Sequence, residues 1–248
     1  MINNISCVII VKNAQDTLPE VLDSLVDFSD VVVYSNNSTD NTNEIAKQYS
    51  NVNLIIGTFE GFGKTKNNAA SYAKNDWIFS LDADEVLSKS FIKNLKQLSL
   101  DNRNIYSILR VNYYKSQQIK YCWGNDILIR LYNRKLTSFT EVKVHEKIMK
   151  KEFNVKHLEG NIKHLPYQNI SQFIEKADYY STLFAENNVG KKKSSPLKAF
   201  FNGMYSFFRT YILKRGFMDG YIGLIIAYSH MVTNFFKYIK LYELNKEL

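Results

Sequence analysis

The sequence has few of the residues that hold small secreted or fibrous proteins together. It contains two cysteines, Cys7 and Cys122, which cannot build a disulfide framework. Three prolines and ten glycines exclude a collagen-like tract and leave no room for a long flexible linker. Because Met1–Asn4 has no basic start and no long apolar stretch, we expect no signal peptide. The scarcity of cysteine favours a reducing, cytosolic setting.

Positive charge is concentrated at one end of the chain. The net charge is +8, and residues 191–248 hold ten basic and three acidic residues, which accounts for +7. A basic segment of this kind is typical of binding to anionic lipid, nucleic acid or an anionic substrate. Since 45% of the residues are hydrophobic and 23% are charged, most of the chain is expected to be globular.

Short apolar runs alternate with helical segments in the first third of the sequence. The runs predict buried strands over residues 5–11, 31–34, 52–56 and 77–81. Alternation of strand and helix at this spacing predicts crossovers onto a parallel sheet, and therefore an α/β fold. Further along, we predict a helix over 91–98 and strands over 105–111 and 127–132.

An acidic cluster follows the fourth predicted strand directly. Asp82 and Asp84 flank one small residue, so their carboxylates can meet a common hard cation such as Mg²⁺ or Mn²⁺, which in turn suits a diphosphate. In parallel sheets, ligands collect at the carboxyl ends of the strands, where this pair is expected to lie. The alternative is a solvated acidic turn that caps the helix near Ser88.

Two common nucleotide-binding motifs are absent. Gly63-Lys64-Thr65 resembles the end of a phosphate-binding P-loop, but that motif needs a glycine where Thr58 stands. No G-x-G-x-x-G segment follows the first predicted strand, so a dinucleotide-binding fingerprint is missing as well. A nucleotidyltransferase of related fold would need a glycine-rich loop at Lys12-Asn13-Ala14-Gln15.

Four sequence blocks, in order along the chain, resemble family 2 glycosyltransferases, which have the GT-A fold. The blocks are Val8-Ile9-Ile10-Val11-Lys12-Asn13, Asn36-Asn37-Ser38-Thr39-Asp40, Lys66-Asn67-Asn68 and Ser80-Leu81-Asp82-Ala83-Asp84-Glu85. Later stretches are similar to bacterial lipopolysaccharide core glucosyltransferases, namely Arg130-Leu131-Tyr132, Val144-His145-Glu146, 211–217 and Asp219-Gly220. The resemblance implies a catalytic domain over 1–190 and a basic, aromatic helical extension over 191–248.

The resemblance also implies an activity: metal-dependent, inverting transfer of a hexose. The expected donor is UDP-glucose, with galactose and N-acetylhexosamine as alternatives. The expected acceptor is a lipid-linked core oligosaccharide, and the expected cofactor is Mg²⁺ or Mn²⁺. Glu146 is the candidate general base, and the alternative is a surface glutamate paired with Lys143 or Lys150.

The remaining candidate residues fall into three groups. The donor nucleotide is expected to contact Val11, Lys12, Asn13, Asn36, Lys66, Asn67 and Asp82. The metal is expected to bind Asp82, Asp84 and His164, and the acceptor side is expected to include Asp126, Arg130 and His145. Two positions depart from the family pattern, because Ser35 and Asn36 stand where aspartates are common. A lone histidine is more often a structural hydrogen-bonding residue than a ligand.

The carboxyl-terminal segment predicts a membrane-surface element. Ser195 and Pro196 are typical of a helix start, and aromatic residues then recur every three or four positions, mixed with Lys and Arg. The apolar stretch at 217–232 falls short of the roughly 20 residues that a spanning helix requires. We therefore expect a peripheral protein on the inner face of the cytoplasmic membrane that does not act on nucleic acid. Helices that cover the catalytic domain, and a non-catalytic nucleic-acid-binding protein, are the alternatives.

Overall fold

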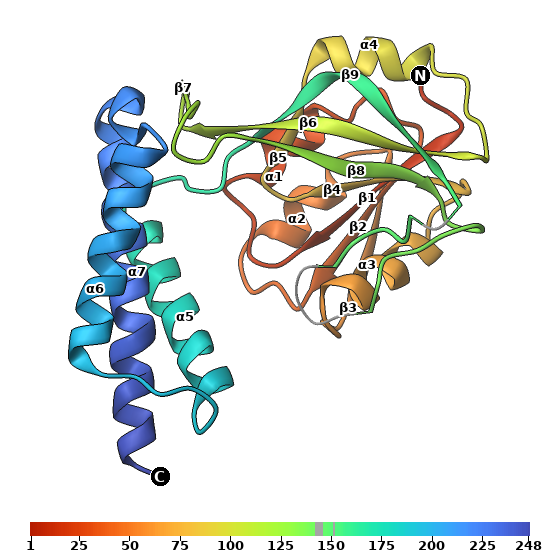
Figure 1. Ribbon diagram of the computed structural model, residues 1–248. Coiled ribbons are helices and arrows are strands. Elements are labelled where there is room, and N and C mark those ends of the chain that lie inside the picture. Colours follow the sequence, from red (N-terminus) through yellow and green to blue (C-terminus); the bar gives the residue numbers. More distant parts are fainter. Residues whose placement is uncertain (142–145, 151) are drawn as a thin grey trace. The chain divides into compact units, whose positions relative to one another are not determined.

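The computed structural model describes residues 1–141, 146–150 and 152–248 (Figure 1). It separates into two compact units. The first unit comprises 1–111 and 126–164, and the second comprises 112–125 and 165–248. By packing, the second unit therefore starts earlier than residue 191 and takes in a segment from the middle of the chain. The predicted division by role, with catalysis in 1–190 and attachment in 191–248, stays a prediction.

Within the described residues, the sheet that organises the first unit has nine strands, one of which, β7, belongs to the second unit (Figure 1). Their order is β3-β2-β1-β4-β8-β6-β9-β5, and β7 pairs with β6. The strands are β1 (Ile5–Val11), β2 (Val31–Asn36), β3 (Val52–Gly57), β4 (Trp77–Asp82), β5 (Glu85–Leu87), β6 (Asn104–Tyr114), β7 (Gln117–Gln118), β8 (Asn125–Asn133) and β9 (Asn154–His164). The last three residues of β6, together with β7 and Asn125, belong to the second unit.

The parallel half of the sheet confirms the α/β prediction. β1 pairs in parallel with β2 and β4, and β2 pairs in parallel with β3. β1 and β2 are buried almost throughout, as expected for apolar runs covered on both faces. β4 ends at Asp82, which is in register with Ile10 of β1. The acidic pair thus begins at the carboxyl end of a central strand, as predicted.

Four short helices connect the strands of the first unit. They are α1 (Leu18–Asp23), α2 (Thr42–Lys47), α3 (Phe62–Ser71) and α4 (Lys89–Lys96). Ser88 caps α4 by accepting a hydrogen bond from the backbone N–H of Phe91. Asp40 accepts the backbone N–H groups of Thr42 and Gln15, so its side chain joins the start of α2 to the loop that follows β1.

α3 begins at Phe62, and a glycine in its first turn explains its position. A side-chain carbon at Gly63 would lie 1.9 Å from the carbonyl oxygen of Thr140 and 3.3 Å from Cβ of Glu146. Only glycine allows this approach. The first turn of α3 is therefore fixed against the segment that carries Glu146.

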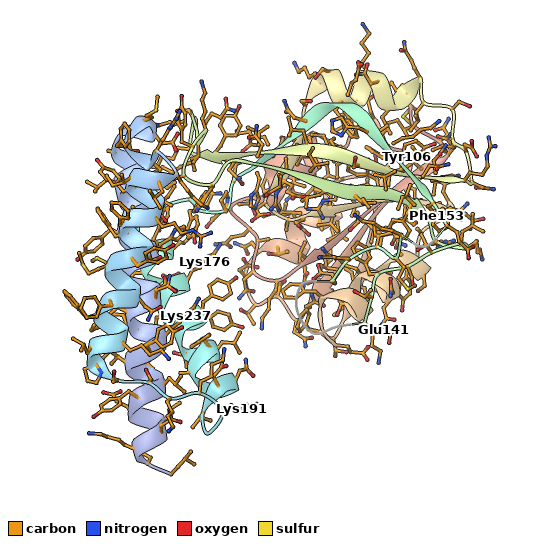
Figure 2. All side chains as sticks on the ribbon, viewed as in Figure 1. Tyr106, Glu141, Phe153, Lys176, Lys191 and Lys237 are labelled. Carbon is orange, nitrogen blue, oxygen red and sulfur yellow. The ribbon has the colours of Figure 1, made fainter. Side chains whose placement is uncertain are left out.

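The second unit is a helical bundle built around its last helix. α7 (Gly220–Lys246) packs against both α5 (Ser171–Asn188) and α6 (Pro196–Phe208) (Figure 1). A π-helical turn (Arg209–Leu213) and a 3₁₀ turn (Gly216–Asp219) join α6 to α7. Lys176 and Lys237, labelled in Figure 2, lie over the rings of Tyr167 and Phe184 at 4.4 and 5.5 Å.

Asp219 fixes the 112–125 segment to this bundle. Its buried carboxylate accepts the backbone N–H groups of Lys120, Tyr121 and Cys122 at 2.8–3.0 Å. Three charge-assisted hydrogen bonds to one carboxylate are enough to hold a loop without secondary structure of its own. None of the helices in the described part of the chain combines the length and apolar character needed to cross a bilayer.

His230 on α7 is held in its neutral form. The indole N–H of Trp123 donates to Nε2 at 3.3 Å, and Nδ1 lies 2.9 Å from the hydroxyl of Thr210, so Nδ1 carries the proton. Burial lowers the pKa of His230 to about 4, and Lys214, Lys237 and Arg209 lower it further through their charge. The ring is therefore an uncharged bridge between the π-helical turn and the loop that carries Trp123.

This geometry predicts a pH-dependent contribution to stability. Between pH 6.5 and 4, the unfolded chain protonates His230 but the folded protein does not, so stability falls as the pH falls through that window. The advantage of the wild type over His230→Gln, measured by urea unfolding, should shrink by about 2 kcal/mol between pH 7.5 and pH 4.5. Above pH 7.5 the difference should be constant. A difference that does not change with pH would contradict the buried neutral state.

Candidate active site

A cavity of about 410 Å³ opens at the carboxyl end of β4 in the first unit. It is lined by charged and apolar side chains from α3, β4, β6 and β8 and by residues 139, 146–148 and 150. The lining residues are Lys66, Asp82, Arg110, Ile127, Leu128, Ile129, Arg130, Phe139, Glu146, Lys147, Ile148 and Lys150. The cavity brings together four of the predicted site residues, each from a different segment of the chain: Lys66, Asp82, Arg130 and Glu146.

Lys66 is the cation at the centre of this cavity. Its ammonium donates to Oδ1 of Asp82 at 3.0 Å and to Oε1 of Glu146 at 2.9 Å, and it lies 5.2 Å from the ring centre of Phe139. Burial opposes the charged form, but the two carboxylates outweigh it, and the pKa of Lys66 is raised. Lys66 therefore carries a fixed positive charge between two acids.

Asp82 is bound by cations on both of its oxygens. While Lys66 holds Oδ1, the Arg130 guanidinium donates to Oδ2 at 2.7 Å. Burial alone would raise the pKa of Asp82, but the charges of Arg130 and Lys66 hold it well below its usual range. Arg130 itself is buried, and the same carboxylate raises the pKa of its guanidinium against the opposing effect of burial. The structure thus places Arg130 against Asp82 inside the cavity wall.

Glu85 completes this arrangement beneath Asp82. Its side chain is fully buried, and one oxygen accepts hydrogen bonds from Arg110, at 3.2 Å, and from Arg130. The other oxygen accepts the backbone N–H of Asp82 at 3.0 Å. Glu85 therefore fixes Asp82 twice, directly through its backbone and indirectly through Arg130.

The contacts join into one chain of alternating charge. Arg110 also donates to Asp126 at 2.8 Å, which ties that predicted acceptor-side residue to the cavity wall. In order of contact, the chain is Glu146, Lys66, Asp82, Arg130, Glu85, Arg110 and Asp126. Glu85 and Arg110 are not among the site residues that the sequence predicts. Glu85 lies within the acidic block, whereas nothing local marks Arg110, which comes from β6.

The second aspartate of the acidic pair has a different partner. Oδ2 of Asp84 lies 3.4 Å from Nε2 of His164 at the end of β9, and both side chains are partly exposed. A carboxylate oxygen and an imidazole nitrogen form a donor set that suits Mn²⁺ or Mg²⁺ when phosphate oxygens complete the coordination. In the described residues no group of three or more such side chains is found. A divalent ion bound at this end of the sheet would be held by Asp84 and His164, because the cations on Asp82 disfavour a second positive charge there.

The predicted uridine side lies at the ends of β1 and β2. Oδ1 of Asn13 accepts the backbone N–H of Thr39 at 2.8 Å, which ties together the loops that follow the two strands. Asn36 ends β2 and is 6% exposed. Its Oδ1 is buried and has no hydrogen-bond partner within the described residues. A buried amide oxygen without a partner is unfavourable in the free protein, so it is a candidate for a ligand N–H.

Other predicted site residues have structural partners or lie outside the described residues. Asn67 exchanges two hydrogen bonds with the backbone of Phe139, at 2.9 and 3.0 Å, and so fixes α3 to that segment. Lys64 forms an exposed ion pair with Glu60, away from the cavity lining. Val11 ends β1, and Lys12 follows it on the surface. His145 lies outside the described residues.

Comparison with known proteins identifies the family. The model of glycosyl transferase family 2 matches residues 6–157, so the chain belongs to this family and is a glycosyltransferase with the GT-A fold. It is 28% identical to an uncharacterized glycosyltransferase of Rickettsia typhi over 259 residues, covering 97% of this chain and 87% of the relative. It is also 26% identical to the lipopolysaccharide core biosynthesis glycosyltransferase LpsC of Rhizobium meliloti, covering 96% of this chain and 92% of LpsC.

Solved structures with a similar fold include TarS of S. aureus. The match covers 91% of this chain and 55% of TarS at 16% identity, with a TM-score of 0.49. A second match is glucosyl-3-phosphoglycerate synthase of Mycobacterium tuberculosis, at 20% identity and a TM-score of 0.35, covering 46% of this chain and 44% of that protein.

The double role of Glu85 predicts a strong effect of removing its charge. Glu85→Gln removes the buried anion that the buried Arg130 and the partly buried Arg110 share, which should lower the free energy of unfolding by about 3–5 kcal/mol. The matched control is Asp76→Asn, which removes a half-exposed partner of Arg134 and should cost less than about 1 kcal/mol. Denaturant unfolding of both variants measures the difference. Equal, small losses would show that Glu85 does not hold the charge chain together.

Proposed function

We propose that the protein is a metal-dependent, inverting hexosyltransferase that moves glucose from UDP-glucose onto a lipid-linked lipopolysaccharide core oligosaccharide. The observation that carries this proposal is the pairing of Asp82 and Glu146 through one buried ammonium at the cavity. An inverting displacement needs a base on one side of the sugar carbon and positive charge on the other. Lys66 is hydrogen-bonded to Glu146, the candidate base, and itself supplies a positive charge.

Glu146 acts as the general base. Lys66 holds Oε1 of Glu146, and the second oxygen takes the proton from the acceptor hydroxyl as that hydroxyl attacks the anomeric carbon. The carboxylate is partly buried, so its hydrogen bond to the acceptor is shielded from water. Gly63 supports this role, because the close contact of α3 with residue 140 fixes the backbone beside Glu146.

The leaving diphosphate requires neutralisation. Lys66 supplies one positive charge, and Asp84 with His164 would hold the divalent ion. When bound, the ion would stabilise negative charge on the departing phosphate. Asp82 orients Lys66 and is itself oriented by Arg130 and Glu85, so in this proposal it positions the cations instead of binding the metal.

At the other end of the donor, Asn36 reads the uracil. Its unpaired Oδ1 accepts the imide N–H of the base, and Asn13 and Lys12 lie on the loop that follows the neighbouring strand. Asn67 supports the donor side of the cavity through its two hydrogen bonds to the backbone of Phe139. Arg110 lines the cavity from β6 and would contact the acceptor, together with Asp126, to which it donates a hydrogen bond.

The acceptor proposal is supported by the likeness to LpsC, whose name places it in lipopolysaccharide core biosynthesis. A lipid-linked acceptor puts the reaction at a membrane, so the protein would work as a peripheral protein on the inner face of the cytoplasmic membrane. The concentration of basic residues in 191–248 supports this location.

Donor hydrolysis tests the activity and identifies the sugar. The protein is incubated with UDP-glucose, UDP-galactose and UDP-N-acetylhexosamines, each with and without Mn²⁺, and UDP release is measured. We expect rapid release from UDP-glucose in the presence of Mn²⁺. Preference for another UDP-sugar would replace glucose as the transferred sugar. No release from any UDP-sugar, with an acceptor extract present, would overturn the proposed reaction.

Loss of the metal side is predicted for Asp84→Ala. This variant should lose both UDP release and Mn²⁺-dependent binding of UDP, measured by calorimetry, while its melting temperature stays near that of the wild type because Asp84 is partly exposed. Asp27→Ala, which removes a similarly exposed aspartate paired with Lys96, is the control and should keep both. Full activity of Asp84→Ala in the presence of a chelator would exclude this role.

Loss of the base is predicted for Glu146→Gln. The amide keeps the shape but cannot take a proton, so the transfer rate should fall roughly 100-fold or more. UDP affinity should change little, and the exposed Glu60→Gln should leave both quantities unchanged. A variant that keeps its rate but loses UDP binding would refute the assignment. Asp126, or Glu141 beside α3 (Figure 2), would then be the next candidate.

A further inference from the structure

α6 differs from an ordinary amphipathic helix, because its small residues are buried and its large apolar residues are exposed. Its buried residues are Ala199 and Gly203. A side-chain carbon at Gly203 would lie 3.2 Å from both the Met231 carbonyl oxygen and Cβ of Phe235, so α6 meets α7 through a face of small residues. The large apolar side chains of α6 therefore do not form the core of the bundle.

Those large side chains lie together on the outer face of α6. They follow the spacing i, i+3, i+4, i+7, i+8, i+11, which places them on one side of a helix. They are 46–67% exposed: Leu197, Phe200, Phe201, Met204, Tyr205 and Phe208. An apolar stripe of three helical turns facing solvent is unusual for a protein surface without a partner.

Further exposed apolar residues follow α6 along the chain. Through the π-helical turn, the 3₁₀ turn and the first turns of α7, the exposed residues are Ile212, Leu213, Phe217, Met218, Tyr221 and Leu224. We call these residues, together with the α6 stripe, the outer apolar face. It spans about 18 Å along α6 alone, at about 1.5 Å per residue.

The charge around the outer apolar face has one sign. Between residues 191 and 228 the sequence holds seven basic residues, namely Lys191, Lys192, Lys193, Lys198, Arg209, Lys214 and Arg215. The single acidic residue in this range is Asp219, which is buried and bound to backbone N–H groups. Lys191 lies at the end of the bundle where α5 gives way to the loop before α6 (Figure 2). Within residues 191–228, therefore, no acidic side chain at the surface offsets the positive charge.

We propose that the outer apolar face inserts into the headgroup and upper acyl region of an anionic bilayer, with α6 lying in the membrane plane. Aromatic and aliphatic side chains partition into that region, while Lys and Arg bind the lipid phosphates. A second copy of the chain is a poorer occupant, because a twofold interface would bring this basic segment against itself. This inference rests on the membrane location in the proposed function and names the surface that makes the contact.

Site-specific labelling tests the insertion directly. The two native cysteines are buried, so an environment-sensitive dye reacts with an introduced one. Phe201→Cys reports on the outer apolar face, and Tyr180→Cys, an exposed aromatic position on α5, is the matched control. With vesicles of phosphatidylcholine and phosphatidylglycerol, the dye at 201 should shift to the blue and the dye at 180 should not. Equal shifts at both positions, or none at 201, would overturn the proposal.

Vesicle flotation with the full chain measures how much the apolar and the basic residues contribute to membrane binding. Tyr205→Ser, on the outer apolar face, should weaken vesicle binding roughly tenfold, whereas Tyr180→Ser should leave it unchanged. Changing Lys191, Lys192 and Lys193 together to Gln should weaken binding to anionic vesicles and reduce its salt dependence, with little effect on neutral vesicles. Helical content by circular dichroism checks that each variant is folded.

The same variants separate the alternatives. If the wild type is dimeric by light scattering and Tyr205→Ser is monomeric, with no vesicle binding by either, the face is an interface between copies and the proposal is wrong. If single-stranded nucleic acid competes with vesicles at equal strength for the wild type and Tyr205→Ser alike, insertion is also excluded. Vesicle binding is measured without donor or acceptor, and UDP release without vesicles, so either proposal can fail while the other stands.

Discussion

The active-site region depends on the burial of Glu85 between two arginines. One cation would balance the charge of a buried carboxylate. Glu85 accepts hydrogen bonds from two cations, Arg110 and Arg130, and also from the backbone N–H of Asp82. Arg130 can then reach Asp82, Asp82 can hold Lys66, and Lys66 can hold Glu146. Each link is an ion pair in a setting where burial penalises an unpaired charge. The end of β4, the wall formed by β8 and the segment at 146 are therefore positioned by one electrostatic arrangement instead of by several independent contacts.

The parts of the fold that the sequence predicts well are those whose burial is simple. β1 and β2 are covered on both faces, so their residues form unbroken apolar runs, and the strands end within two residues of the predicted limits. α5 and β9 carry no such signal. The buried face of α5 is Phe173, Ala177, Ser181 and Ala185, which are mostly small residues that leave no apolar stripe. β9 is largely exposed along its first half and has few apolar residues, so its pairing with β5 is visible only in three dimensions.

The residues of the candidate site also differ in how well the sequence predicts them. Asp82, Asp84 and Lys66 could be chosen from the sequence because they lie at strand ends and in family blocks. Arg110 could not be chosen in this way, because it comes from β6, and its approach to Glu85 depends on strand order and register. For α6, the sequence predicts the helix but not the face that is buried. Its aromatic periodicity correctly indicates a helix, but periodicity does not say which face is buried, and in α6 the small residues are the ones that pack.

The discontinuity of the second unit limits how the protein can be dissected. Residues 112–125 leave the strands of the first unit, form the loop that Asp219 holds, and return as β8. A stop codon after β9 would remove α5, α6 and α7 but leave this loop behind, with three backbone N–H groups and the side chains of Cys122 and Trp123 deprived of their partners. To express the first unit alone, the chain would therefore have to end after β9, and residues 112–125 would have to be replaced by a short hairpin. The same arrangement means that neither half can be exchanged between relatives as a simple cassette.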